Sequence, residues 1–133
     1  AAVDLAIAQF GRLDCVHANA GVLRNQKITD ITLDDFYTLI NVNLLGPVLV
    51  AKYAIPVMER QGKGVICFTT SVAADIGFPA HAVYAASNAA STAAGAPPAK
   101  NTSIPACTAV PTFIFTRTPG ASYPSPYRRL ACV

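Results

Sequence analysis

Apolar residues recur near the start of the chain with two different spacings, one typical of helices and one typical of strands. Residues 2–10 carry apolar side chains at the i, i+3, i+4 spacing, and Gly11 follows as a helix-ending residue. The short apolar run Leu13–His17 then predicts a strand, which a turn at residues 19–22 ends. A helix, a glycine, a strand and a turn in this order indicate an α/β layer built on a parallel sheet.

A second and longer helical pattern begins at Thr32. Thr32 and Asp35 have the spacing of a capping box, in which a hydroxyl and a carboxylate satisfy the first backbone N–H groups of a helix. A mostly apolar stripe continues from there. Pro47 and Pro56 should kink this helix, because each removes a backbone donor and crowds the preceding turn. We expect the helix to end at the glycines of residues 62–64.

The run at residues 65–70 is apolar, β-branched and aromatic almost without a break. Such a run is typical of a strand that is buried on both faces of a parallel sheet. Strand, helix and strand then form one right-handed crossover unit, as in doubly wound proteins. We therefore predict an α/β fold with a doubly wound parallel sheet, of which this chain carries the central strand-helix-strand portion.

The character of the sequence changes after Asn88. Seven of the ten prolines lie in residues 97–126, and together with Ser91, Thr92 and Gly95 they leave no room for a long helix after Tyr84. The end of the chain has turn residues but no apolar period, which is typical of a poorly ordered segment. We therefore predict one folded domain at residues 1–90 and a divergent, proline-rich, irregular tail at residues 91–133.

Composition fits a globular chain and excludes one class of partner. The 133 residues are 53% apolar and 13% charged, which excludes a disordered polar chain. The net charge is +3, but every acidic residue lies between Asp4 and Asp75, so the excess of positive charge comes from the tail. The few cations of that tail are too sparse for an electrostatic footprint, and we predict no nucleic-acid partner.

The cysteines and the apolar stretches bear on the cellular setting. The cysteines form no Cys-x-x-Cys pair, so neither a zinc site nor a redox dithiol is indicated: Cys15, Cys67, Cys107 and Cys132. We expect Cys15 and Cys67 to be small buried side chains in a reducing, cytoplasmic setting. Residues 48–58 are interrupted by Lys52 and too short to span a bilayer, and the first residues lack a basic lead, so we predict neither membrane insertion nor a signal peptide.

The candidate chemistry lies in residues 70–88. Ser71 follows the predicted strand, and Tyr84 begins an alanine-rich, helix-prone segment, so the two hydroxyls can meet in one cleft. Asn43 lies in the long helix upstream, and the turn Asn19-Ala20-Gly21 follows the first strand. The order and spacing of these residues resemble the short-chain dehydrogenase/reductase family.

The resemblance covers residues 1–90 and departs from the family in two places. Ala18 stands where the family turn Asn-Asn-Ala-Gly has its first asparagine, and Asn88 stands where the motif Tyr-x-x-x-Lys has its lysine. Residues 103–116 resemble a later strand and a Pro-Gly-x-x-x-Thr turn of the family, with Thr112 in place of the glycine. The family is about twice as long as this chain, so we expect the chain to be a fragment.

The resemblance implies a partial Rossmann-like, NAD(P)-binding domain, and hydride transfer between a nicotinamide and a secondary alcohol or ketone in the complete enzyme. Ser71 would position the substrate oxygen, Tyr84 would transfer its proton, and Asn43 would support the proton relay. The cofactor-binding residues would be Asn19, Ala20, Gly21 and Asn88. No metal is implied. The expected partner is a small alcohol or ketone, and the resemblance leaves room for a homo-oligomer.

Two features limit what the resemblance implies. The family's phosphate-binding turn, Gly-x-x-x-Gly-x-Gly, does not occur in the sequence, so the choice between NAD and NADP stays open. Tyrosine in water ionises near pH 10, and a lysine cation about 5 Å away would favour the phenolate by roughly 3 kcal/mol. Asn88 can hydrogen-bond a ribose hydroxyl but supplies no charge, and Lys100 lies beyond two prolines. We therefore expect this chain to be weakly active or inactive.

Each candidate residue also has a structural interpretation. Ser71 can cap a turn, Tyr84 can be a half-buried aromatic, and Asn43 can be a hydrogen-bonded core amide. A lone His17 or His81 is more often structural than metal-binding. Three residues have the side chains of a hydrolase triad, but no Gly-x-Ser-x-Gly elbow surrounds the serine: Ser71, Asp75 and His81. The alternative function is a non-catalytic remnant that at most associates with relatives.

Overall fold

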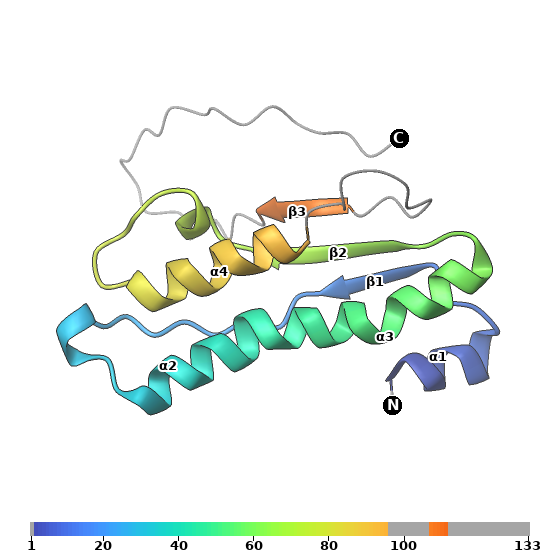
Figure 1. Ribbon diagram of the computed structural model, residues 1–133, viewed down its shortest axis with the longest axis horizontal. Coiled ribbons are helices and arrows are strands. Elements are labelled where there is room, and N and C mark those ends of the chain that lie inside the picture. Colours follow the sequence, from blue (N-terminus) through green and yellow to red (C-terminus); the bar gives the residue numbers. More distant parts are fainter. Residues whose placement is uncertain (1, 96–106, 112–133) are drawn as a thin grey trace, which may run out of the picture.

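The computed structural model describes residues 2–95 and 107–111, and its sheet has three parallel strands (Figure 1). These are β1 Cys15–Ala18, β2 Val65–Thr70 and β3 Cys107–Pro111, in the order β1-β2-β3. In the register, Cys15 pairs with Val65 and Cys67 pairs with Cys107, and the second ladder has an irregularity before Thr69. Parallel neighbours need crossover connections. The predicted α/β fold with a parallel sheet is confirmed.

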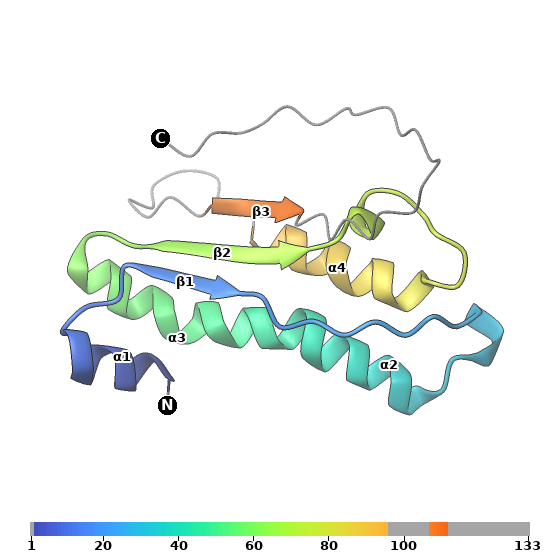
Figure 2. The same ribbon diagram turned by 180° about the vertical axis from the view of Figure 1, so that it is seen from behind.

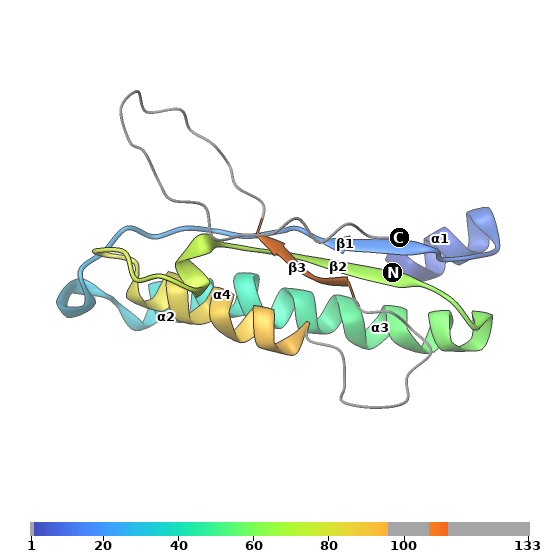
Figure 3. The same ribbon diagram turned by 90° about the horizontal axis from the view of Figure 1, so that it is seen from above.

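Helices supply these crossovers (Figures 1 and 2). The α-helices are α1 Ala2–Phe10, α2 Leu33–Ile40, α3 Gly46–Gln61 and α4 Ala82–Ala94. A π-helical turn, η2 Asn41–Leu45, joins α2 to α3, and the 3-10 turns are η1 Ile28–Asp30 and η3 Val72–Ala74. Figure 3 shows α2, α3 and α4 together on one side of the sheet. The other side carries none of these three helices.

The long helical segment from α2 through η2 to α3 begins and ends as predicted. The Thr32 hydroxyl accepts from the Asp35 backbone N–H (3.1 Å) and donates to the Asp35 carboxylate (2.7 Å). Gly62 ends α3 in the left-handed conformation, with φ 72°. Gly46 follows directly after η2, and Pro47 is the second residue of α3, where it donates no backbone hydrogen bond. Pro56 lies inside α3.

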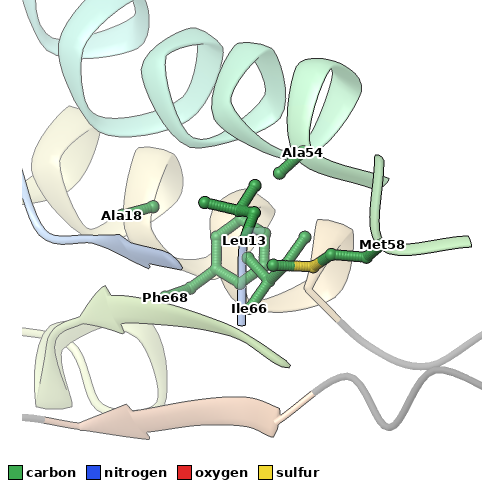
Figure 4. Packing of buried hydrophobic residues seen from close by; sticks show 6 residues of the cluster. All are labelled: Leu13, Ala18, Ala54, Met58, Ile66 and Phe68. Carbon is green, nitrogen blue, oxygen red and sulfur yellow. The ribbon is translucent and has the colours of Figure 1, made fainter. Parts of the chain in front are cut away.

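The core lies between the sheet and α3. Six buried apolar side chains meet there (Figure 4): Leu13, Ala18, Ala54, Met58, Ile66 and Phe68. Ala54 and Met58 come from α3 and are completely buried, and apolar side chains of α1 pack against the same cluster. Buried apolar area stabilises at about 25 cal/mol per Å². This contact therefore fixes α3, and with it η2, over the strands.

The face of the sheet that points away from α2, α3 and α4 is more exposed than predicted. Along β2, Ile66 and Phe68 are buried while Val65 and Cys67 are only half-buried, so the expected burial on both faces is wrong. Cys15 is exposed, and both Cys15 and Cys67 are free thiols, which corrects the prediction of two buried cysteines. The physical reason is that α2, α3 and α4 all cover the same face of the sheet (Figure 3).

The prediction that no long helix can form after Tyr84 is wrong, because α4 extends to Ala94. α4 has 13 residues and continues ten residues beyond Tyr84, since the alanine-rich segment meets its first proline only at Pro97. β3 falls within residues 103–116, where a strand was expected. Most of the predicted irregular tail lies outside the described residues.

The segment Leu33–Gln61 is long and apolar enough to cross a membrane by length and composition, with 29 helical residues and a mean hydropathy of 1.4 in its most apolar window. The prediction that the apolar stretch at residues 48–58 is too short did not anticipate that η2 keeps the helix continuous with α2. Core helices of globular proteins meet the same criterion, so length and composition alone are weak evidence for a membrane span.

Candidate active site

The seven residues predicted for the site line one cavity, although they come from four separate segments. The cavity has a volume of about 640 Å³ and lies past the carboxyl ends of β1 and β2, where parallel sheets usually bind ligands. The predicted residues on its wall are Asn19, Ala20, Gly21, Asn43, Ser71, Tyr84 and Asn88. The structure therefore brings together all the side chains that the sequence singled out.

The turn after β1 is held by a chain of hydrogen bonds across the sheet. The Thr69 hydroxyl donates to Asn19 Oδ1 (2.9 Å), and Thr69 Oγ1 lies 2.7 Å from His17 Nε2. Because the single hydroxyl hydrogen goes to Asn19, His17 must donate through Nε2–H. His17 thus has the structural role expected of a lone histidine, and it steadies the Asn19 side chain at the cavity wall.

Asn43 is buried in η2 and joins two walls of the cavity. Its Oδ1 accepts from the Val22 backbone N–H (2.8 Å), and its Nδ2 donates to the Val22 carbonyl (2.9 Å) and to Ser87 Oγ (3.1 Å). Both amide hydrogens are therefore in use. Asn41, two residues earlier, is exposed on another side of the helix.

Ser71 follows β2 and caps η3. Its Oγ accepts from the Ala73 backbone N–H (3.2 Å), so the hydroxyl hydrogen stays available for another acceptor. The capping interpretation and the catalytic one are thus compatible, since they use different parts of the same hydroxyl.

Tyr84 lies in the first turn of α4 and is half-buried. Its backbone carbonyl accepts from Ser87 Oγ (2.8 Å) and from Asn88 Nδ2 (2.9 Å). Its phenolic oxygen forms no hydrogen bond with any residue that the structure describes. The hydroxyl is therefore available to a ligand in the cavity.

The described residues of the cavity wall include no carboxylate, lysine or arginine side chain. Asn88 is buried on this wall and directs its amide to the Tyr84 carbonyl, so it supplies hydrogen bonds and no charge. Lys100, the alternative cation considered from the sequence, lies outside the described residues.

The sequence analysis did not place two aromatic residues in the site, Phe78 and His81. Phe78 and His81 line the same cavity, with the ring of His81 between those of Phe78 and Tyr84. The available signal was the regular spacing of Phe78, His81 and Tyr84, which follow one another at intervals of three residues. His81 Nδ1 donates to the Pro79 carbonyl (2.6 Å), so only Nε2 is left, and one nitrogen cannot serve both the serine and the carboxylate of a hydrolase triad.

The loop after β1 is tied to the entrance of α2 and to the loop before α4. The Gln26 backbone N–H donates to the Ala80 carbonyl (2.9 Å), and Gln26 Nε2 donates to Asp35 Oδ2 (2.9 Å). Hydrogen bonds from Gln26, Thr32 and Arg24 lower the pKa of Asp35 from its ordinary value. No group of three or more metal-ligating side chains occurs among residues 2–95 and 107–111.

Known proteins are similar to this chain along most of its length. A model of the short chain dehydrogenase family matches residues 1–118. An uncharacterized oxidoreductase of Thermotoga maritima is 41% identical over 88 residues, which are 66% of this chain and 35% of that protein. A hydroxynaphthalene reductase of Aspergillus fumigatus is 37% identical over 84 residues, covering 63% of this chain and 30% of the relative.

A solved structure extends this similarity to the fold. The alcohol dehydrogenase of the archaeon Thermococcus sibiricus, solved in complex with 5-hydroxy-NADP, superposes with a TM-score of 0.64 at 28% identity, over 68% of this chain and 38% of that chain. This chain therefore spans about a third of the length of the relatives it matches. The Rossmann-like fold class is confirmed. With the family model matching most of its residues, the chain belongs to the short-chain dehydrogenase/reductase family.

Proposed function

We propose that the chain is the central part of an NAD(P)-dependent oxidoreductase that interconverts a secondary alcohol and a ketone. The observation that carries this proposal is the convergence of the seven predicted site residues on one cavity at the carboxyl edge of the sheet. A bound nicotinamide would supply or accept the hydride. The residues of this chain then have to hold the reacting oxygen and move its proton.

Ser71 and Tyr84 suit these two tasks. The Ser71 hydroxyl keeps its hydrogen for a substrate oxygen while its Oγ accepts from Ala73. The Tyr84 hydroxyl is the proton donor in ketone reduction and the proton acceptor in alcohol oxidation. Its position in the first turn of α4 places the phenol near the positive end of the helix dipole.

Asn43 acts as a positioning residue in this proposal. Its amide links Val22 to Ser87, and Ser87 in turn donates to the carbonyl of Tyr84. Asn43 thereby supports the proton relay by fixing the turn of α4 that carries the tyrosine.

The cofactor fits the cavity in part. The wall formed by Asn19–Gly21 and Asn88 offers amide groups for a ribose or a nicotinamide amide, and a Cβ at Gly21 would lie 3.6 Å from Asn43 Oδ1, in ordinary contact. We propose that NAD or NADP lies here with its nicotinamide half. The glycine-rich turn that receives the pyrophosphate has no counterpart in the sequence.

Weak activity follows from Asn88. A helix N-terminus stabilises a nearby anion by about 0.3–1 kcal/mol, whereas a lysine about 5 Å away would contribute roughly 3 kcal/mol. The dipole of α4 therefore offsets only a small part of what the missing cation would give. We propose that the chain as it stands turns over slowly or not at all.

A chimera tests this function. Residues 2–95 replace the matching stretch of the Thermotoga maritima oxidoreductase, and oxidation of NADH or NADPH is followed by absorbance with a panel of ketones. We expect Asn88→Lys to raise kcat by about 100-fold. On that background Tyr84→Phe should lower kcat by at least about 100-fold.

Tyr37→Phe is the matched control, because this exposed tyrosine of α2 is not on the cavity wall and its replacement should leave kcat unchanged. A chimera that gains nothing from Asn88→Lys would contradict the tyrosine-lysine argument. Equal effects of Tyr84→Phe and Tyr37→Phe would contradict the role of Tyr84.

A second candidate function has its own observation. Exposed apolar side chains run along α2, η2 and α3, and we define this outer face by Phe36, Tyr37, Leu45, Val48, Leu49, Tyr53 and Ile55. We propose that the outer face binds a second copy or a longer relative, which a non-catalytic remnant could also do. A cytoplasmic location without membrane or nucleic-acid partners stays a prediction from composition.

A further inference from the structure

Three aromatic rings form a row along one wall of the cavity. The ring centroids of Phe78 and His81 lie 6.0 Å apart, and those of His81 and Tyr84 lie 5.9 Å apart. The interplanar angles are 57° and 70°, so neighbouring rings meet edge to face or at a tilt. We call Phe78, His81 and Tyr84 the aromatic row. It leads from the loop before α4 to the proposed proton donor.

Local backbone contacts hold the row in place. Ala80 adopts a left-handed conformation with φ 61°, which is costly for a residue with a Cβ and persists only where the surroundings enforce it. Its carbonyl accepts from the Gln26 backbone N–H, and the ring of His81 is fixed by its bond to the Pro79 carbonyl. The aromatic row is therefore preorganised rather than free to collapse.

Apart from hydroxyl and amide groups, the other described residues of the cavity wall are apolar. Val22 and Leu23 line the cavity together with the row, and none of the described lining residues carries a carboxylate, an ammonium or a guanidinium group. Phe78 and Leu23 keep 36% and 49% of their surface exposed. Among these described residues a charged substrate would find no carboxylate, ammonium or guanidinium counter-ion, whereas a flat apolar ring would contact the edges and faces of the aromatic row.

We propose that this site selects neutral aryl ketones and the corresponding aryl alcohols, with Phe78 and His81 as specificity-determining residues. The inference rests on the proposed function, because Ser71 and Tyr84 must receive the carbonyl oxygen while the ring of the substrate contacts the aromatic row. An aromatic pair gains about two- to tenfold in affinity over an aliphatic contact of the same area. A saturated ketone of the same shape should therefore bind more weakly.

Two ketones with the same carbon skeleton provide the test. The chain is titrated with 1-tetralone and with 1-decalone by calorimetry, and saturation-transfer NMR checks the weaker ligand. We expect 1-tetralone to bind about fivefold more tightly. Phe78→Leu should remove most of this preference by weakening 1-tetralone alone. Phe10→Leu is the matched control, since Phe10 is 74% exposed on α1 and lies neither on the cavity wall nor on the outer face.

The outcomes separate this inference from the proposed function. Equal binding of the two ketones, a tighter complex with 1-decalone, or no binding of either one overturns the aryl preference. So does an equal loss of 1-tetralone affinity in Phe78→Leu and Phe10→Leu. Ser71→Ala should weaken both ketones by the same factor. If it changes neither while the preference for 1-tetralone persists, the carbonyl-binding role is wrong and the aromatic row still stands.

Discussion

The buried amide of Asn43 holds two walls of the cavity together without itself being the proposed proton donor. Its three hydrogen bonds reach the loop after β1 and the first turns of α4, two segments that lie far apart in the sequence. A side chain with fewer than two donors and one acceptor could not make this connection. The identity of the residue is therefore set by the packing of the cavity wall as much as by any role in catalysis.

Replacing Asn43 with alanine should cost about 2 kcal/mol in the free energy of unfolding, because the Val22 backbone groups and the Ser87 hydroxyl lose their partner in a buried place. Asn41→Ala is the control, since this asparagine is exposed in the same π-helical turn and its loss should cost less than about 0.5 kcal/mol. Urea unfolding followed by circular dichroism measures both. Equal midpoints for the two variants would show that the Asn43 bonds contribute nothing.

For single residues, the sequence predicted which side chains meet at the cavity but not which hydrogen bonds they form. The positions of Ser71 and Tyr84 relative to the strand and the helix were sufficient to bring them to one cavity. His81 was expected to be structural because a single histidine in a loop is a weak signal, and its spacing of three residues from Phe78 and Tyr84 was not used. Its importance appears only once Phe78 and Tyr84 are seen to flank its ring.

The contact between α3 and β2 depends on a glycine at the element boundary. Gly64 precedes β2, and a Cβ built there would lie 2.6 Å from Met58 Cβ, closer than such atoms approach in proteins. Met58 is completely buried in the core cluster, so it has little space to withdraw. The close approach of the two elements therefore requires a residue without a side chain.

Gly64→Ala should destabilise the fold by about 1–3 kcal/mol, as expected for overpacking in a close-packed core. Gly77→Ala is the matched control, because no atom lies within 4 Å of its built Cβ and its φ is not in the left-handed region. That variant should be neutral or slightly stabilising. Thermal unfolding compares them, and a Gly64→Ala chain as stable as Gly77→Ala would contradict the packing argument.

The elements themselves were largely predictable. The capping box, the glycine at the end of α3 and the run of β2 each have a local physical cause that the sequence displays. The exposed face of the sheet was not predictable, because a continuous apolar run looks the same whether one face or both are covered. The length of α4 was underestimated, since a proline ends a helix only near its own position and the first proline after Tyr84 is Pro97.

For the whole molecule, the outer face of α2, η2 and α3 is an apolar surface that the described fold leaves exposed. Tyr53 is 60% exposed and Tyr37 57%, on helices whose inner side packs over the sheet. Large exposed apolar patches often mark interaction sites, and the apolar side chains of the outer face are 38% to 60% exposed. The same surface explains why the segment is apolar enough to pass for a membrane span. Under the proposal that the outer face binds a second copy, both observations have one explanation.

Leu49→Glu should weaken self-association at least tenfold, because it places a charge in the middle of the outer face and burying that charge on association is costly. Ile28→Glu is the control, since this residue is 73% exposed in η1 and lies outside the outer face. Sedimentation velocity over a concentration series measures the mass of each variant. A wild-type chain that stays monomeric throughout, or equal behaviour of the two variants, would rule out the outer face as the site where a second copy binds.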